Sequence, residues 1–218
     1  MEIYNSEQEQ VEALKAWWEK NGRDTLIGLA VVLASVFGYQ QWDGHRKGVA
    51  EAASIHYQKL VEMMPGDPVA ASEAGQSLIA NYPDSSYAVM ASMALAKLAV
   101  EGGDLDAAAA HLRSAMEKSD QPEIAALARL RLARVEFAQG KLDQALATVN
   151  GGENGGAVDA LRGDILLAQG KVDAARAAYT AAVAGLSETP NKRELVQTKL
   201  DDLAKQAPTT NSVETGAE

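Results

Sequence analysis

The stretch LRGDILLAQGKVDAARAAYTAAV, residues 161–183, decides the fold of this chain. Two runs rich in leucine and alanine flank Gly170 within it. Glycine readily adopts the backbone conformation of a tight turn, and Asp173 then falls in the first turn of the second run, where a helix favours negative charge. The stretch therefore predicts two helices joined by a short turn.

Two earlier stretches repeat this pattern. EGGDLDAA surrounds Gly103 and AQGKLDQA surrounds Gly140, so the three turn glycines are 37 and 30 residues apart. Small residues recur at fixed distances from these glycines and indicate where two helices cross closely. Seven residues before the glycines come Ala96, Ala133 and Gly163, and five residues after them come Ala108, Ala145 and Ala175.

These residues resemble the tetratricopeptide repeat, a helix-turn-helix unit with a period of about 34 residues. The last copy is the best match, because Tyr179 and Ala182 stand where that motif has an aromatic and a small residue. One helix pair cannot bury its apolar face alone, so the copies are expected to stack into a right-handed solenoid. We predict a further helix pair at 50–64 and 69–81 and a capping helix at 192–206.

The N-terminal part predicts a membrane span. Residues 25–39, TLIGLAVVLASVFGY, carry no charge, and the three tryptophans of the chain, Trp17, Trp18 and Trp42, bracket this run as they do at bilayer interfaces. Residues 25–42 would extend roughly 27 Å, close to the ~30 Å hydrocarbon core. We therefore expect an all-α chain in which one N-terminal transmembrane helix precedes a tetratricopeptide-like solenoid.

Two alternatives exist for this apolar run. A cleaved signal peptide needs a short basic start and a small-residue cleavage site, whereas the preceding segment is long and acidic and no such site follows. A buried core helix leaves the tryptophans unexplained. The predicted divisions are a tail with an interfacial helix at 1–24, the span at 25–42, the repeat domain at 43–206 and a disordered tail at 207–218.

Within the span, Ala30, Ala34 and Gly38 share one helical face. Such a stripe lets a second helix approach closely, although alanine and glycine are also simply common in spans. Orientation stays open at this point, because the basic residues that flank the span are balanced under the positive-inside rule. These residues are Lys15, Lys20 and Arg23 before it and Arg46, Lys47 and Lys59 after it.

Composition and motifs argue against several classes of function. A net charge of −10 disfavours nucleic-acid binding, and the absence of cysteine removes disulfides and thiolate sites. None of the three histidines has a glutamate at zinc-helix spacing, and GGENGG at 151–156 lacks the lysine and the preceding strand of a phosphate loop. We therefore expect no metal, no cofactor and no enzymatic activity, and we interpret 151–156 as a long turn.

A binding surface for polypeptides is the remaining candidate. The first helix of each repeat should line the concave face of the solenoid, and methionine there adapts to varied apolar partners. The alternative is that about half of these residues are simply core. Counting back from the turn glycines selects Met90, Met93, Lys97, Leu130, Arg134 and Phe137 as candidate partner- or client-binding residues, with Val100, Leu127, Ala157, Ala160, Asp164 and Leu167 at equivalent positions.

The whole chain resembles the YfgM family, from residue 4 to about residue 205. The resemblance rests on MEIYNSEQEQVEALKAWWEKNG, the apolar run, QKLVEMM, NYPDSSYAVMASMALAKLAVEGGDLDAA and the quoted third repeat. It implies a single-span inner-membrane protein of Gram-negative bacteria with a cytoplasmic amino terminus and a periplasmic repeat domain. It also implies an ancillary subunit of the SecYEG translocon that works with a membrane-anchored periplasmic prolyl isomerase, PpiD, and hands emerging polypeptides to periplasmic chaperones.

This resemblance carries over no catalytic residue and no mapped partner-binding residue. The competing interpretation is a membrane-anchored scaffold or regulator that assembles a complex without touching unfolded clients.

Overall fold

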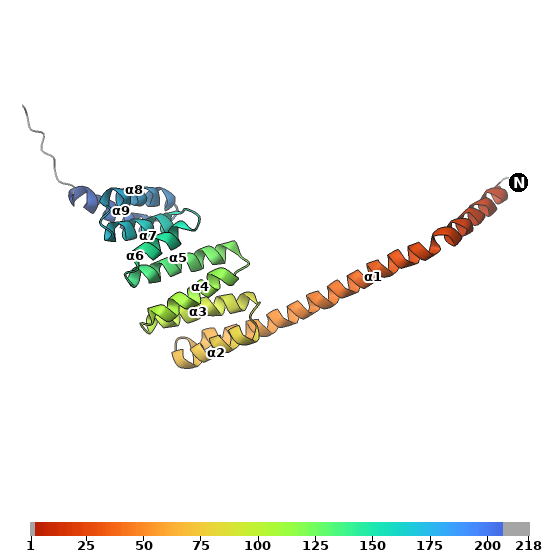
Figure 1. Ribbon diagram of the computed structural model, residues 1–218, viewed down its shortest axis with the longest axis horizontal. Coiled ribbons are helices and arrows are strands. Elements are labelled where there is room, and N and C mark those ends of the chain that lie inside the picture. Colours follow the sequence, from red (N-terminus) through yellow and green to blue (C-terminus); the bar gives the residue numbers. More distant parts are fainter. Residues whose placement is uncertain (1–2, 207–218) are drawn as a thin grey trace, which may run out of the picture. The chain divides into compact units, whose positions relative to one another are not determined.

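The computed structural model describes residues 3–206, and it is entirely helical outside its turns. This confirms the all-α fold class, and Figure 1 shows the helices in chain order. The predicted tail at 207–218 lies outside the described residues. The helices are α1 (Ile3–Met63), α2 (Pro68–Asn81), α3 (Ser86–Glu101), α4 (Leu105–Lys118), α5 (Pro122–Ala138), α6 (Leu142–Asn150), α7 (Gly156–Ala168), α8 (Val172–Gly185) and α9 (Pro190–Gln206).

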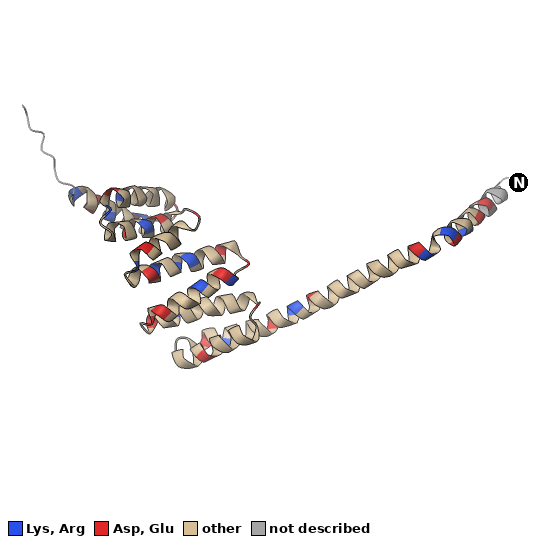
Figure 2. Ribbon diagram, viewed as in Figure 1, with Lys and Arg blue, Asp and Glu red and all other residues tan. Residues whose placement is uncertain are grey.

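The chain divides into two compact units, Met1–Ala52 and Ala53–Glu218, and the division falls within α1. In the first unit α1 runs as one helix through the predicted interfacial segment and the predicted span. It is long and apolar enough to cross a membrane, and Figure 2 shows a stretch of it without charged residues. The boundaries of the span itself remain a prediction from the sequence.

The three turns within the repeats have the predicted glycines at their centres. Gly103, Gly140 and Gly170 have φ angles of 80°, 74° and 75°, a left-handed conformation that other residues rarely adopt. They join α3 to α4, α5 to α6 and α7 to α8. The predicted register of the repeats is therefore confirmed, as are the helix α2 before them and the long turn between α6 and α7. The prediction that a separate helix begins at residue 50 is wrong, because this segment is the last part of the continuous helix α1.

Small residues bring the paired helices close together. Ala96 and Ala133 are 2% and 0% exposed, and Gly163 faces the ring of Tyr179 so closely that an added Cβ would lie 2.5 Å from two ring carbons. Each helix from α3 to α8 packs mainly on the helices before and after it in the chain, and α2 and α9 pack on α3 and α8. The second unit is thus a stack with one core shared between neighbours, as a solenoid requires.

Helix α9 closes the stack. Val196 and Leu203 are buried in a cluster with Tyr179 and Leu186. The carboxylate of Asp164 accepts a hydrogen bond of 2.7 Å from the Tyr179 hydroxyl and one of 2.6 Å from Lys199. Burial, followed by the bond to this carboxylate, raises the pKa of Tyr179. The predicted capping helix is therefore confirmed and is tied to both helices of the last repeat.

Candidate peptide-binding groove

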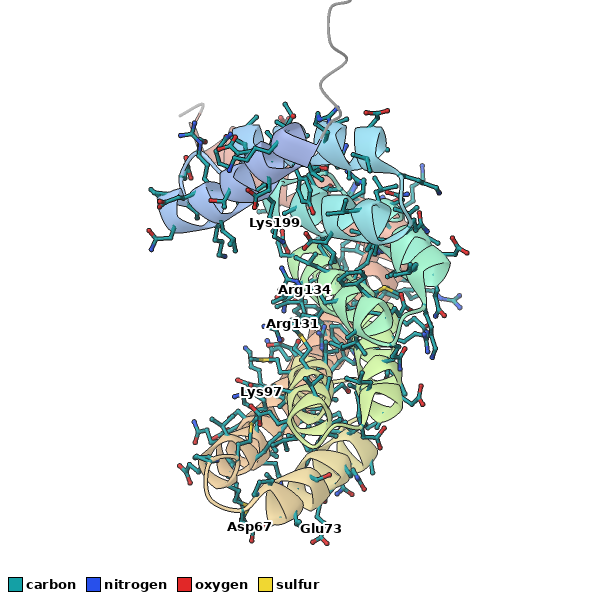
Figure 3. The ribbon with its side chains drawn as sticks, turned by 90° about the vertical axis from the view of Figure 1, so that its left-hand side faces the viewer. Asp67, Glu73, Lys97, Arg131, Arg134 and Lys199 are labelled. Carbon is teal, nitrogen blue, oxygen red and sulfur yellow. The ribbon has the colours of Figure 1, made fainter. Side chains whose placement is uncertain are left out.

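A hollow of about 390 Å³ lies between α3 and α5, the first helices of two successive repeats. We refer to it as the α3–α5 groove. Its lining is mostly apolar, and basic side chains stand at its rim. Figure 3 shows Lys97, Arg131 and Arg134 along the inner side of the repeat unit. The lining residues are Met93, Ala96, Lys97, Val100, Glu101, Leu105, Leu112, Arg131, Arg134, Val135 and Ala138.

Helical periodicity places these side chains together. Helix α3 begins at the N-cap Ser85, whose hydroxyl oxygen accepts a hydrogen bond of 3.1 Å from the backbone N–H of Ala88. From this start Met93, Lys97 and Val100 follow at i, i+4 and i+7, so they share one face. Arg134 and Ala138 are four apart on α5 and face the same hollow.

The basic residues of the groove have few internal partners. Within the described part of the chain, Arg131 and Arg134 form neither an ion pair nor a side-chain hydrogen bond. Lys97 lies 3.6 Å from Glu101 one turn later, and both side chains are more than half exposed. Exposed pairs of this kind contribute at most about 1 kcal/mol. The rim of the groove therefore offers positive charge to a partner, in a chain whose net charge is −10.

Three of the six predicted binding residues meet in this groove: Met93, Lys97 and Arg134. Met93 is only 9% exposed and also packs in a core cluster with Val89, Ala115 and Ala128, so it belongs to the groove floor. Arg131 was not selected from the sequence. Its position three residues before Arg134, on the same helical face, is the signal that could have identified it.

Phe137 lies in a second hollow. This hollow, of about 570 Å³, is formed by α5, α7, α8 and α9. Phe137 is half-buried there, together with Leu167 and the Lys199 that holds α9 in place. Because Lys199 already pairs with Asp164, this second hollow has no free basic rim of the kind seen between α3 and α5.

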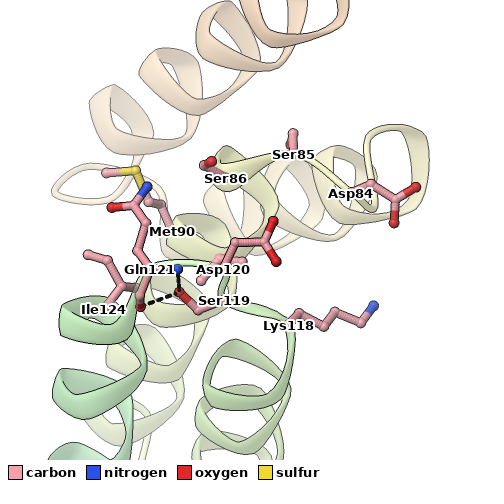
Figure 4. Close-up of a pocket in the computed structure, with 10 residues that line it drawn as sticks. Asp84, Ser85, Ser86, Met90, Lys118, Ser119, Asp120, Gln121 and Ile124 are labelled. Atoms are coloured by element: carbon pink, nitrogen blue, oxygen red, sulfur yellow. Dashed lines mark hydrogen bonds between the residues drawn. The ribbon is translucent and has the colours of Figure 1, made fainter. Parts of the chain in front are cut away.

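Met90 and Leu130 lie apart from both hollows. Met90 is 37% exposed and lies beside a small pocket near the loop that joins α4 to α5. Figure 4 shows this pocket, where the Ser119 hydroxyl donates a 3.0 Å hydrogen bond to the carbonyl oxygen of Gln121. Leu130 is half-buried and packs on the core cluster shared by α5, α6 and α7, which includes Ile165. Their proposed contact with partners stays a prediction.

The small-residue stripe lies in the first unit of the chain. Ala30, Ala34 and Gly38 are exposed on α1, and a Cβ built at Gly38 would meet no side chain or other segment of the described chain within 4 Å beyond the adjoining helix backbone. A close-packing role in the membrane therefore remains a prediction. Among the described residues, no cluster of three histidine, aspartate or glutamate side chains could hold a metal ion.

Comparison with known proteins identifies the family. The family described as a tetratricopeptide repeat-like domain matches residues 15–205. The ancillary SecYEG translocon subunit of Escherichia coli is 33% identical to this chain over 94% of it and 100% of its own length. The proteins of the same name from Aggregatibacter actinomycetemcomitans and Haemophilus influenzae are 33% and 31% identical, over 90% and 92% of this chain and 97% and 99% of their own. The chain belongs to this family.

The match confirms the resemblance to the YfgM family along nearly the whole sequence. A thermophilic tetratricopeptide repeat protein from Thermus thermophilus, 21% identical, superposes with a TM-score of 0.50 over 68% of this YfgM-family chain and 81% of the other. That likeness concerns the fold alone.

Proposed function

We propose that this YfgM-family chain is an ancillary subunit of the SecYEG translocon in the bacterial inner membrane. The proposal rests on a relative of that name that aligns over 94% of this chain and its own whole length, and on the family match at residues 15–205, which includes the apolar segment of α1. Residues 25–42 of α1 would cross the membrane once, with the amino terminus in the cytoplasm and the repeat domain in the periplasm. Its role there is to bind polypeptides, not to catalyse a reaction.

The repeat domain would bind emerging or unfolded polypeptides on its inner side and pass them to periplasmic chaperones, with a membrane-anchored periplasmic prolyl isomerase of the PpiD type as partner. Support for this comes from the open apolar lining of the α3–α5 groove and from Arg131 and Arg134 beside it, which have no partner among the described residues. A groove of this kind offers many modest contacts and contains an adaptable methionine, so it suits partners that must be released again.

Reporter fusions test the topology. A reporter enzyme that is active only in the periplasm, fused after Glu218, should be active, and a reporter that fluoresces only in the cytoplasm should be dark at the same point. The opposite pair of results would place the repeat domain in the cytoplasm and contradict the proposal.

Site-specific photo-crosslinking tests the binding role. A photoreactive amino acid at Lys97, whose side chain is 64% exposed in the groove, should crosslink to secretory chains arrested during export and to the isomerase. The same probe at Glu117, exposed on α4 and outside every hollow described above, is the control. Crosslinks from Lys97 to the isomerase or translocon without any to emerging chains would favour the scaffold alternative.

A further inference from the structure

We infer that the α3–α5 groove selects polypeptide segments in which carboxylates alternate with apolar side chains, in preference to unfolded chain in general. This inference rests on the proposed function, because it assumes that the groove binds polypeptide. It assigns the substrate class from two features of one surface: the apolar floor around Met93 and Val100, and the pair of arginines beside it.

The groove has two basic side chains that are free to bind a partner's carboxylates. Arg131 and Arg134 are exposed and have no acidic partner among the described residues, whereas Lys97 pairs with Glu101 and Lys199, in the second hollow, pairs with Asp164. A guanidinium group presents a planar set of donors that fits a carboxylate in a bidentate manner. The two arginines are therefore free to receive carboxylates from a partner.

The spacing of the two arginines fits alternate residues of an extended peptide. They lie three residues apart on α5, which corresponds to about 4.5 Å along the helix axis. Side chains at i and i+2 of an extended peptide point the same way and lie about 7 Å apart. Long arginine side chains can take up this difference. Two carboxylates at i and i+2 would then reach both arginines.

The floor of the groove accounts for the apolar part of the segment. Met93, Ala96, Val135 and Ala138 lie within the same lining as the arginines, and Val100 is 45% exposed at its edge. Successive side chains of an extended peptide point in opposite directions, so a segment whose carboxylates face α5 would turn its alternating apolar side chains toward Met93, Ala96 and Val100 of α3. This would remove those residues from water, which is favourable. A purely acidic segment would leave this floor uncovered, and a purely apolar one would leave the arginines unpaired.

Peptide binding to the full-length chain in a non-ionic detergent tests the inference. The probe is a fluorescent ten-residue peptide with two glutamates separated by one leucine and flanked by leucine and valine, and the matched probe has glutamine in place of both glutamates. Fluorescence anisotropy should show about tenfold tighter binding of the glutamate peptide. The difference should shrink at 0.5 M salt, because exposed charges are then screened.

Variants of the two arginines test whether these residues cause the preference for glutamate. Exchanging both in R131Q/R134Q should abolish the preference for glutamate, whereas K192Q/R193Q removes the same charge from exposed positions on α9 and should preserve it. The reversed variant R131E/R134E should instead prefer a peptide with lysines at the two positions. A preference that survives in R131Q/R134Q would overturn the inference.

The outcomes separate this inference from the proposed function. If wild-type protein binds both peptides equally, the groove binds polypeptide but does not select carboxylates, and only the inference fails. If it binds neither, and crosslinking at Lys97 also finds no client, the proposed function of the groove fails as well. If sedimentation without peptide shows a dimer that R131Q/R134Q loses, the occupant is a second copy of this acidic chain, and the inference is wrong.

Discussion

The side-chain amide of Gln139 donates a hydrogen bond of 2.9 Å to the carboxylate of Asp106, one repeat earlier. Gln169 and Asp143 form the same contact at 2.8 Å in the next pair of repeats. In both pairs the glutamine directly precedes a turn glycine, and the aspartate lies three residues after the previous one. Neighbouring repeats are therefore joined by a regular polar contact as well as by their apolar core.

We expect this contact to couple the two residues energetically. Asp106→Ala and Gln139→Ala should give a coupling free energy of about 0.5 to 1 kcal/mol in a double-mutant cycle, since the bond involves a charged acceptor but lies in solvent. Urea unfolding of the repeat domain measures it. The pair Asp106→Ala and Gln169→Ala, whose side chains share no hydrogen bond, is the control and should be additive.

The repeat domain, residues 44–206, should fold by itself as a soluble helical unit. Its buried clusters extend from Leu60 to Leu203, so they lie wholly in the second unit of the chain. Far-UV circular dichroism should show a helical spectrum, and urea should unfold the domain cooperatively. An aggregated or unfolded product would mean that the membrane segment is needed for folding.

Replacement of Gly163 by alanine should destabilise the last repeat. The new methyl group would lie 2.5 Å from the Tyr179 ring, and overpacking of this kind costs about 1 to 3 kcal/mol. Gly155→Ala is the matched control, because a Cβ at Gly155 meets no atom within 4 Å. Equal stability of the two variants would show that the Gly163 crossing is not tightly packed.

The stability of the domain should depend on the protonation of His111. Burial lowers the pKa of His111 below its ordinary value of 6.5, and Asp104 offsets part of this effect. The unfolded chain therefore binds this proton more readily, and the stability that neutral His111 contributes above about pH 6.5 is lost as the pH falls below it. Between about pH 7 and 5, wild type should lose more stability than His111→Gln. Parallel curves for the two proteins would contradict this.

The stripe on α1 predicts contact with a partner's spanning helix. Ala34→Leu adds bulk where close approach needs small side chains, so less translocon and isomerase should co-purify with the variant, while membrane insertion stays intact. Val32→Leu lies on a different face of α1 and should leave recovery unchanged. Full recovery with Ala34→Leu would assign docking to the repeat domain.

The sequence predicted the repeat turns well because each one depends on local chemistry. Gly103, Gly140 and Gly170 must all adopt a conformation that other residues avoid, and the small residues at the crossings follow at fixed distances from them. Such constraints act within about a dozen residues, so a single sequence is enough to identify them.

The lining of the α3–α5 groove was predicted only in part because it depends on how successive repeats rotate against each other. Counting along α5 selected Leu130, Arg134 and Phe137, but the groove is lined by Arg131, Arg134 and Ala138. Leu130 and Phe137 pack on the core shared with α6 and α7. The side chains of a helix that face a hollow are determined by the volumes of many side chains packed between the repeats. The spacing of residues within one helix gives no information on that packing.

Because each helix packs mainly on its neighbours along the chain, the repeat unit is expected to deform elastically under force. Among the described helices, nearly all packing is between neighbours along the chain, so a force applied along the repeat unit would be transmitted from one helix pair to the next. Small changes at each interface would add up and widen or narrow the α3–α5 groove. The short helix α6, where only Ala145 and Val149 are buried, is the element expected to yield first. If the groove binds polypeptide as proposed above, tension on the bound segment would reach the neighbouring repeats through these interfaces.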